Sequence, residues 1–225
     1  MDIVEQITAL PRDWHGAGGL HPRVLRAMEK HCRRDSLLDH TAETGSGKST
    51  LLFSHLSRHH VVFSLDRGDS MLRVRESDLL RPGVVEFVEG PTQRTLPKHE
   101  FKAQLQAALI DGPHAYPFPD LEYYFLYPRL ETGAVLILDD IDIPTIERMF
   151  RIIKADRMFE LAEVVRETAF FRRTDQPAHD PFGDGWWLQG FNKPLHDRKL
   201  RKQRRRERRA GGFWPFRKLP AKEMP

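Results

Sequence analysis

Short runs of apolar and β-branched residues recur along the chain and alternate with segments whose apolar residues follow helical spacing. Segments such as STLLFSHLSRH and FPDLEYYFLYPRLE have this helical spacing. Strands that alternate with helices form βαβ units, so we expect an α/β fold with a doubly wound, mostly parallel sheet. The runs that predict its strands are SLLDHTAE (36–43), HVVFSLD (60–66), GVVEFVE (83–89), AALID (107–111) and AVLILDD (134–140).

The pattern changes after the fifth run. Residues 144–155 start with a proline and continue with helical periodicity, which predicts a helix. The segment FELAEVVRETAFFRRT (159–174) predicts a strand or strand pair, which we expect to complete the sheet with an antiparallel C-terminal strand. Residues 198–209, RKLRKQRRRERR, are basic and low in complexity, which predicts a disordered or marginally helical tail.

These segments divide the chain into an N-terminal helical cap (1–35), a central α/β domain (36–195) and a basic tail that is predicted to be disordered (196–225). With 225 residues, 40% of them hydrophobic, the chain can bury the core of one domain. The single cysteine, Cys32, excludes an internal disulfide and fits a reducing compartment. We find neither a secretory signal nor an apolar stretch long enough to span a bilayer, so we expect a cytoplasmic protein.

The net charge of +4 conceals an asymmetry between the tail and the rest of the chain. From Arg198 onward there are twelve Lys/Arg and two Glu, a balance of +10, which leaves 24 basic and 30 acidic side chains in residues 1–197. A basic run can bind nucleic acid, phosphorylated surfaces or acidic membranes, or it can keep the protein in solution. No aromatic residue interleaves with the charges of 198–209, so nucleic acid is not the favoured partner.

The glycine-rich loop ETGSGKST (43–50) has two interpretations. Preceded by Ala42, it fits a loosened form of the phosphate-binding pattern G-x-x-x-x-G-K-[ST], and LILDD would then bind magnesium. A P-loop nucleotide hydrolase or kinase that uses Ala42–Ser49 is therefore one candidate. In the other interpretation the glycines let the backbone turn and approach a different ligand, and Lys48 is a helix-start residue without a special role.

The strand ends favour the second interpretation. Ligands of an open parallel sheet bind at the carboxyl ends of its strands, where a triphosphate would be repelled by acids. S-adenosylmethionine instead brings a sulfonium, an ammonium and two ribose hydroxyls, and Asp66 follows Gly45 by 21 residues, close to the offset of an acid that binds ribose. The acids at the run ends are Glu43, Asp66, Glu89, Asp111 and Asp139–Asp140, at intervals of 23, 23, 22 and 28 residues.

Four stretches carry a resemblance to a known family. ETGSGKSTLLF, LDRGDS, EGPTQRTLP and LIDGPHAYPFPDLEYYFLYPRLETGAVLILDDI together resemble a class I S-adenosylmethionine-dependent methyltransferase, nearest to the catechol O-methyltransferase and macrocin-type sugar O-methyltransferase group. The resemblance covers about residues 38–145. It implies a Rossmann-like fold, and residues 36–195 would form the methyltransferase domain.

The resemblance also implies roles for single residues. Glu43 would support the methionine end of the cofactor, Asp66 would bind the ribose, and Thr92 with Gln93 would lie on the adenine side. Ser49 departs from the family pattern, because a glycine often stands there. The residues expected to bind the cofactor are Glu43, Gly45, Ser46, Gly47, Ser49, Asp66, Thr92, Gln93 and Asp111.

Asp111, Asp139 and Asp140 follow two strands that should be neighbours. Carboxylate oxygens that converge there suit Mg²⁺ or a similar hard cation, which in the family holds the acceptor hydroxyl. His114 resembles the general base of the sugar-modifying members, and its ordinary pKa suits that task. A simple turn at DGPH and a helix N-cap pair at 139–140 remain the alternatives.

The function expected from the sequence is metal-assisted O-methyl transfer from S-adenosylmethionine to a small-molecule or sugar hydroxyl. A non-catalytic binding module that keeps the cofactor fold is a further alternative. We expect residues 1–35 and 175–195 to form the acceptor pocket. Trp186, Trp187 and Phe191 would line this pocket, form a contact in a homo-oligomer or pack in the core.

Overall fold

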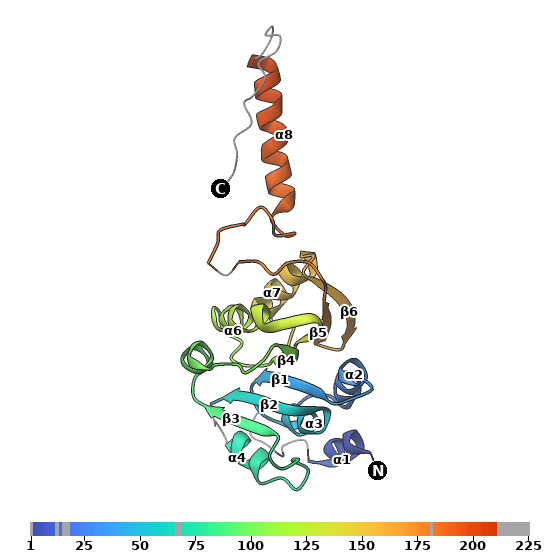
Figure 1. Cartoon of the computed structure of the whole chain (residues 1–225). Coiled ribbons are helices and arrows are strands. Elements are labelled where there is room, and N and C mark those ends of the chain that lie inside the picture. The colour runs from blue at the N-terminus through green and yellow to red at the C-terminus, as the bar shows by residue number, and fades with distance from the viewer. Residues whose placement is uncertain (1, 12–13, 15–18, 66–68, 181, 211–225) are drawn as a thin grey trace.

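A seven-stranded sheet forms the body of the protein (Figure 1). The computed structural model describes residues 2–11, 14, 19–65, 69–180 and 182–210. In this part of the chain the strand order is β3-β2-β1-β4-β5-β7-β6. The strands are β1 (Leu38–Thr44), β2 (Ser57–Ser64), β3 (Val85–Glu89), β4 (Leu105–Ile110), β5 (Leu130–Leu138), β6 (Phe159–Val165) and β7 (Thr168–Arg173).

The direction of the strands confirms the predicted Rossmann-like arrangement. β1 pairs in parallel with both β2 and β4, β2 with β3, and β4 with β5. β7 is antiparallel to β5 and to β6, as the segment 159–174 predicted. β1 and β4 are parallel neighbours, and the strand order reverses between them, with β2 and β3 on one side and β5 on the other. The carboxyl ends of β1 and β4 therefore lie side by side.

Helices cover both faces of the sheet, which is why its central strands are apolar on both sides. The helices of the body are α1 (Ile3–Ala9), α2 (Pro22–Cys32), α3 (Lys48–Leu56), α4 (Ser70–Arg75), α5 (Thr92–Thr95), α6 (Phe118–Leu126) and α7 (Pro144–Ala155), with the short 3-10 helices η2 (Leu96–Lys98) and η3 (Tyr127–Arg129). One core joins Ala108, Leu136 and Phe171 with α6, α7, η2 and η3, and the other joins Leu109, Ile137 and Phe170 with α1–α4.

The N-terminal helices are attached to the antiparallel end of the sheet. Glu163 on β6 accepts hydrogen bonds from Lys30 Nζ at 2.7 Å and lies 2.8 Å from His31 Nε2. The His31 ring also stacks on Phe170 of β7, with 4.9 Å between the ring centroids. The cap therefore packs on β6 and β7 through one ion pair and one buried ring contact.

The basic segment forms a helix in the structure, α8 (Lys193–Ala210), which extends away from the body (Figure 1). The sequence analysis expected a disordered or marginally helical tail. Lysine, arginine, glutamine, glutamate and leucine all have high helix propensity, and no glycine or proline interrupts residues 195–210, which explains the helix. Residues 211–225 lie outside the described part of the chain.

Among the described residues, no helix combines the length and the apolar character that a membrane crossing requires.

Replacement of Phe170 by alanine should strongly destabilise the protein. Phe170 is fully buried, and loss of a buried phenylalanine side chain lowers the free energy of unfolding by about 3–5 kcal/mol. Val164→Ala is the matched control, because Val164 lies on the adjoining strand with 43% of its surface exposed. Urea denaturation should show a loss below about 1 kcal/mol for the control. Equal losses for both variants would contradict the assigned core.

Candidate active site

The carboxyl edge of the sheet gathers most of the residues that the sequence predicted. Glu43 lies near the end of β1, Asp111 follows β4, and Asp139 with Asp140 follows β5. The backbone N–H of Asp139 donates to Ile110 O at 3.2 Å, which joins the ends of β4 and β5. Asp66 lies outside the described residues, so the structure places no ribose-binding acid.

The glycine-rich turn after β1 packs directly against the end of β4. Gly45 has φ of +88°, and a Cβ atom there would lie 2.4 Å from the carbonyl oxygen of Asp111. Only glycine fits both the left-handed backbone and this close approach. Ser46 Oγ lies 3.0 Å from Ser70 Oγ, so the turn also contacts the start of α4. The turn is held between its two neighbours before α3 begins at Lys48.

Glu43 supports this turn from below. Its side chain is fully buried, and Oε1 accepts a hydrogen bond from the hydroxyl of Thr50 on α3. His60 Nε2 on β2 lies 3.2 Å from the same oxygen. Oε2 is buried and has no hydrogen-bond partner among the described residues.

Glu122 is a buried acid at this edge that the sequence analysis did not single out. The carboxylate accepts hydrogen bonds from Thr44 Oγ1 at 2.8 Å and from Thr92 Oγ1 at 2.7 Å. Gly112 makes room for it, since a Cβ atom there would lie 2.2 Å from Glu122 Oε1. An acid at a helical position between Leu121 and Tyr123 was the sequence signal that could have indicated it.

Burial raises the pKa of three carboxyl groups at the edge. The pKa of Glu122 rises to about 7 because the side chain is desolvated, although the two threonine hydroxyls act in the opposite direction. Burial likewise raises the pKa of Asp111 to about 6 and that of Asp139 to about 7, and the mutual repulsion of neighbouring carboxylates adds to both. Perturbed acids gathered at one strand edge are typical of functional sites.

Asp111, His114 and Asp140 form a cluster. One ligand atom from each lies within 4.8 Å of the others. His114 Nε2 is 2.9 Å from Asp140 Oδ2 and 3.7 Å from Asp111 Oδ1. The neighbouring carboxylates of Asp111 and Asp140 raise the pKa of His114 above its ordinary value. The backbone oxygen of His114 accepts a hydrogen bond from Thr145 Oγ1 at 2.6 Å, which fixes the loop to α7.

Asp139 faces away from this cluster, toward β7. It accepts a hydrogen bond from the hydroxyl of Thr168, whereas Asp140 adopts φ of +55° and faces His114. Among the described residues, Asp111, His114 and Asp140 are close enough to share a metal ion, and they include two of the three predicted ligands. The turn after β5 is what separates the two neighbouring acids.

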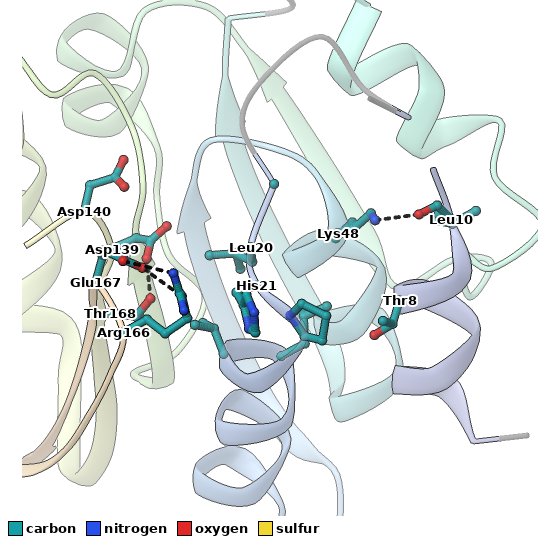
Figure 2. A pocket seen from close by; sticks show the side chains of 14 residues that line it. Thr8, Leu10, Leu20, His21, Lys48, Asp139, Asp140, Arg166, Glu167 and Thr168 are labelled. Atoms are coloured by element: carbon teal, nitrogen blue, oxygen red, sulfur yellow. Dashed lines mark hydrogen bonds and ion pairs between the residues drawn. The ribbon is translucent and has the colours of Figure 1, made fainter. Parts of the chain in front are cut away.

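Lys48 has a structural role that the sequence analysis did not give it. Its ammonium group donates to the backbone oxygen of Leu10 at 2.9 Å, and only 8% of the residue is exposed. Burial lowers the pKa of Lys48. The bond joins the N-terminal cap to the first residue of α3, as Figure 2 shows.

A cavity of about 640 Å³ opens between the cap and the strand ends (Figure 2). Its walls come from the cap, the start of α3, the end of β5 and the β6–β7 turn. Residues of the segment 1–35 form part of these walls, as expected, whereas no described residue of 175–195 lines the cavity. The lining residues are Thr8, Leu10, Gly19, Leu20, His21, Pro22, Val24, Leu25, Lys48, Asp139, Asp140, Arg166, Glu167 and Thr168.

The remaining predicted residues lie in different surroundings. Ser49 is buried in the first turn of α3, and Thr92 is buried against Glu122, whereas Gln93 is exposed. Trp187 and Phe191 are largely exposed in the segment before α8, away from the cavity lining.

Comparisons with known proteins agree with this fold. Residues 42–141 match a family model described as a methyltransferase domain. A search of curated proteins gave no match.

Solved structures with a similar fold have low sequence identity. A protein provisionally assigned as an O-methyltransferase from Klebsiella pneumoniae has a TM-score of 0.59 and 11% identity, over 77% of this chain and 90% of that one. A protein provisionally assigned as a caffeoyl-CoA O-methyltransferase from Staphylococcus aureus has a TM-score of 0.60 and 9% identity, over 77% of this chain and 93% of that one. The O-methyltransferase TomG from Streptomyces achromogenes, solved with S-adenosylmethionine, has a TM-score of 0.55 and 13% identity, over 77% of this chain and 90% of that one.

The domain match and the strand order confirm the resemblance seen in the sequence. The chain contains a methyltransferase domain over residues 42–141, on a sheet with the strand order of the Rossmann-like fold. The glycine-rich loop lies within this domain, and the P-loop interpretation of 42–49 is not retained.

The replacement Glu122→Gln should change how stability depends on pH. The pKa of Glu122 is about 7 in the folded protein and ordinarily 4.5, so its contribution is full below pH 4.5 and is lost as pH rises through 7. Between pH 5 and 8 the wild type should lose about 3 kcal/mol relative to Glu122→Gln. Urea denaturation across this range measures the difference.

Glu160→Gln is the control for this measurement, because Glu160 is an exposed residue of strand β6. Its stability should follow the wild type at every pH. Parallel curves for the wild type and Glu122→Gln would contradict the assigned protonation of the buried carboxyl.

Proposed function

We propose that the protein transfers a methyl group from S-adenosylmethionine to a hydroxyl group of a small-molecule or sugar acceptor. The observation that carries the proposal is the cluster of Asp111, His114 and Asp140 beside the cavity of about 640 Å³. Ligand pockets usually have volumes of about 300–1,000 Å³, so the cavity suits an acceptor of drug-like size. The solved O-methyltransferases with the same fold support oxygen as the acceptor atom.

The residues present fit a divalent cation. Asp111 and Asp140 offer carboxylate oxygens, and a cation between them would offset the repulsion of the two carboxylates. A bound cation would lower the pKa of an acceptor hydroxyl and orient it. Magnesium and Mn²⁺ both suit these carboxylate oxygens.

His114 is the proposed general base. Its imidazole takes the proton of the acceptor hydroxyl, and the Asp140 carboxylate, 2.9 Å from Nε2, stabilises the imidazolium that forms. S-adenosylmethionine supplies the electrophilic methyl group when it is bound. The rest of the catalytic effect is alignment of the acceptor oxygen with that methyl group, which the cavity walls would provide.

The cofactor would lie over β1, β2 and β4. Gly45 and Gly47 let the backbone approach it, Glu43 Oε2 is the free acceptor below the turn, and Asp66 is the proposed ribose ligand. Thr92 is fixed by Glu122 on the adenine side. We keep Ser46, Ser49, Gln93 and Asp111 as further cofactor contacts of this proposal.

Calorimetry with S-adenosylmethionine and with ATP–Mg²⁺ tests the cofactor site. The wild type should bind the first ligand and not the second. Asp66→Ala should weaken binding about ten- to a hundredfold, because hydrogen bonds to a charged acceptor are lost. Lys48→Ala is the control and should change the affinity only a few-fold. Loss of binding in Lys48→Ala alone, with retained ATP binding, would contradict the proposal.

Metal titration followed by electron paramagnetic resonance of Mn²⁺ tests the cation site without an acceptor. Asp111→Asn and Asp140→Asn should each weaken Mn²⁺ binding at least about tenfold, because a charged ligand is lost. Asp139→Asn is the control and should weaken it less, since Thr168 already occupies that carboxylate. Equal binding in all three variants and the wild type would remove the cation from the proposal.

Methyl transfer from labelled S-adenosylmethionine to a panel of phenolic and sugar hydroxyls tests the base. His114→Ala should lower the catalytic rate about 10²–10⁴-fold and keep Mn²⁺ affinity. Full transfer by this variant would contradict the role of base. Joint loss of Mn²⁺ binding and transfer would instead make His114 a metal ligand.

A further inference from the structure

A group of large apolar side chains is exposed just before α8. Phe182 is 93% exposed and Leu188 is 67% exposed, and Trp187, Phe191 and Leu195 are each more than one third exposed. All five lie within residues 182–195, which we call the apolar loop. Several large apolar side chains exposed within one short segment are typical of an interaction site.

The segment that carries the apolar loop is attached to the body of the protein. Tyr127 donates its hydroxyl hydrogen to His179 O at 2.9 Å, and His179 Nε2 lies 2.7 Å from Asp156 Oδ2. At its other end, Gly190 packs so closely on α7 that a Cβ atom there would meet Ala155 O. The apolar side chains are therefore displayed from fixed points at the end of α7.

The helix that follows carries a high positive charge. Between 198 and 208 there are eight lysines and arginines, all of them exposed, and a single acid, Glu207. In the described part of the chain no carboxylate forms an ion pair with any of the eight. At helical spacing the eight basic residues cover more than half of the circumference of α8. The remaining stripe contains His196, Leu200, Gln203 and Glu207.

Trp186 connects the apolar loop to α8. Its ring is 5.8 Å from that of His196 and 6.0 Å from that of Trp187, and Lys199 Nζ lies 5.2 Å from its centroid. Trp186 thus lies against the first turns of the basic helix, with the exposed Trp187 beside it. One extended negative surface could contact both.

We propose that the apolar loop and α8 bind the surface of a membrane that contains anionic lipids. Exposed aromatic and leucine side chains would enter the interfacial region, and the lysines and arginines of α8 would lie among the lipid headgroups. Two weak signals of this kind bind a bilayer reversibly where either alone is marginal. The helix itself stays at the surface, because Leu200 is the single apolar residue between 198 and 208.

Nucleic acid or a second copy of the chain would use only part of this surface. A nucleic-acid duplex would use the charges and leave Phe182, Trp187 and Leu188 exposed, and single strands would favour aromatic residues among the charges. A second copy of the chain would bring its own α8, and two such helices repel each other. An anionic lipid surface uses both features.

Co-sedimentation of the full-length protein with lipid vesicles tests the proposal. Vesicles of phosphatidylcholine with about one third phosphatidylserine are anionic, and vesicles of phosphatidylcholine alone are the neutral reference. At about 0.15 M salt the protein should sediment with the anionic vesicles and remain in solution with the neutral ones. Duplex RNA is added as a competitor, to test nucleic acid as the alternative partner.

Charge substitutions on α8 test the electrostatic part. The fourfold variant should bind anionic vesicles at least about tenfold more weakly, because each basic residue near the surface contributes several-fold. The control removes the same charge from exposed sites elsewhere and should stay within about twofold of the wild type. The variant is Arg204→Gln, Arg205→Gln, Arg206→Gln, Arg208→Gln, and the control is Arg23→Gln, Lys98→Gln, Lys102→Gln, Arg151→Gln.

Phe182→Ser combined with Leu188→Ser tests the apolar part. Vesicle binding that persists at about 1 M salt should fall at least about tenfold in this variant, because screening leaves mainly the apolar contribution. Leu72→Ser, another exposed leucine, is the control and should bind like the wild type. Circular dichroism checks that each variant keeps its helices. Absence of vesicle binding, equal losses in variants and controls, or binding of duplex RNA alone would overturn the proposal.

Discussion

The burial of the Glu122 carboxyl between two threonine hydroxyls organises the ligand edge of this protein. Thr44 ends β1, donates to Glu122 and accepts the backbone N–H of Asp111 at 3.1 Å, while Thr92 opens α5 beyond β3. A side chain of α6 therefore fixes the relative positions of the segments at the carboxyl ends of β1, β3 and β4. Gly112 must lack a side chain for this to occur. The turn at one end of the cofactor site and the acids at the other depend on the same buried group.

The fold could be predicted because the central strands are buried on both faces, which makes them continuous apolar runs that stand out from their flanks. The positions of Glu43 and Asp111 could be predicted for the same reason, because each stands at the end of an apolar run and lies at the carboxyl end of its strand. Which neighbour of a pair faces the site could not be predicted. Asp139 and Asp140 differ through a backbone turn and through Thr168, a residue distant in sequence. Glu122 was missed because helical periodicity does not reveal which side chain reaches a sheet edge.

The basic segment shows how composition and local propensity can lead to different expectations. Its charge and low complexity predicted a disordered or marginally helical tail, yet most of its residues favour helix, and the described part of it is helical. The aromatic residues before it were assigned from sequence to a pocket, a subunit contact or the core. In the structure Trp186 lies against the first turns of α8, and its neighbour Trp187 is largely exposed. Only the three-dimensional contacts separated the two tryptophans.

The bond between Lys48 and Leu10 uses the backbone oxygen of Leu10 and no feature of its side chain. The cap is thus held to the cofactor domain by a contact that tolerates almost any residue at position 10. Eight cavity-lining residues come from this cap, whereas the glycine-rich turn belongs to the domain. The wall of the cavity can consequently diversify by mutation while the attachment and the glycine-rich turn stay unchanged, which under the proposed function makes these eight positions a natural place for new acceptor preferences to evolve.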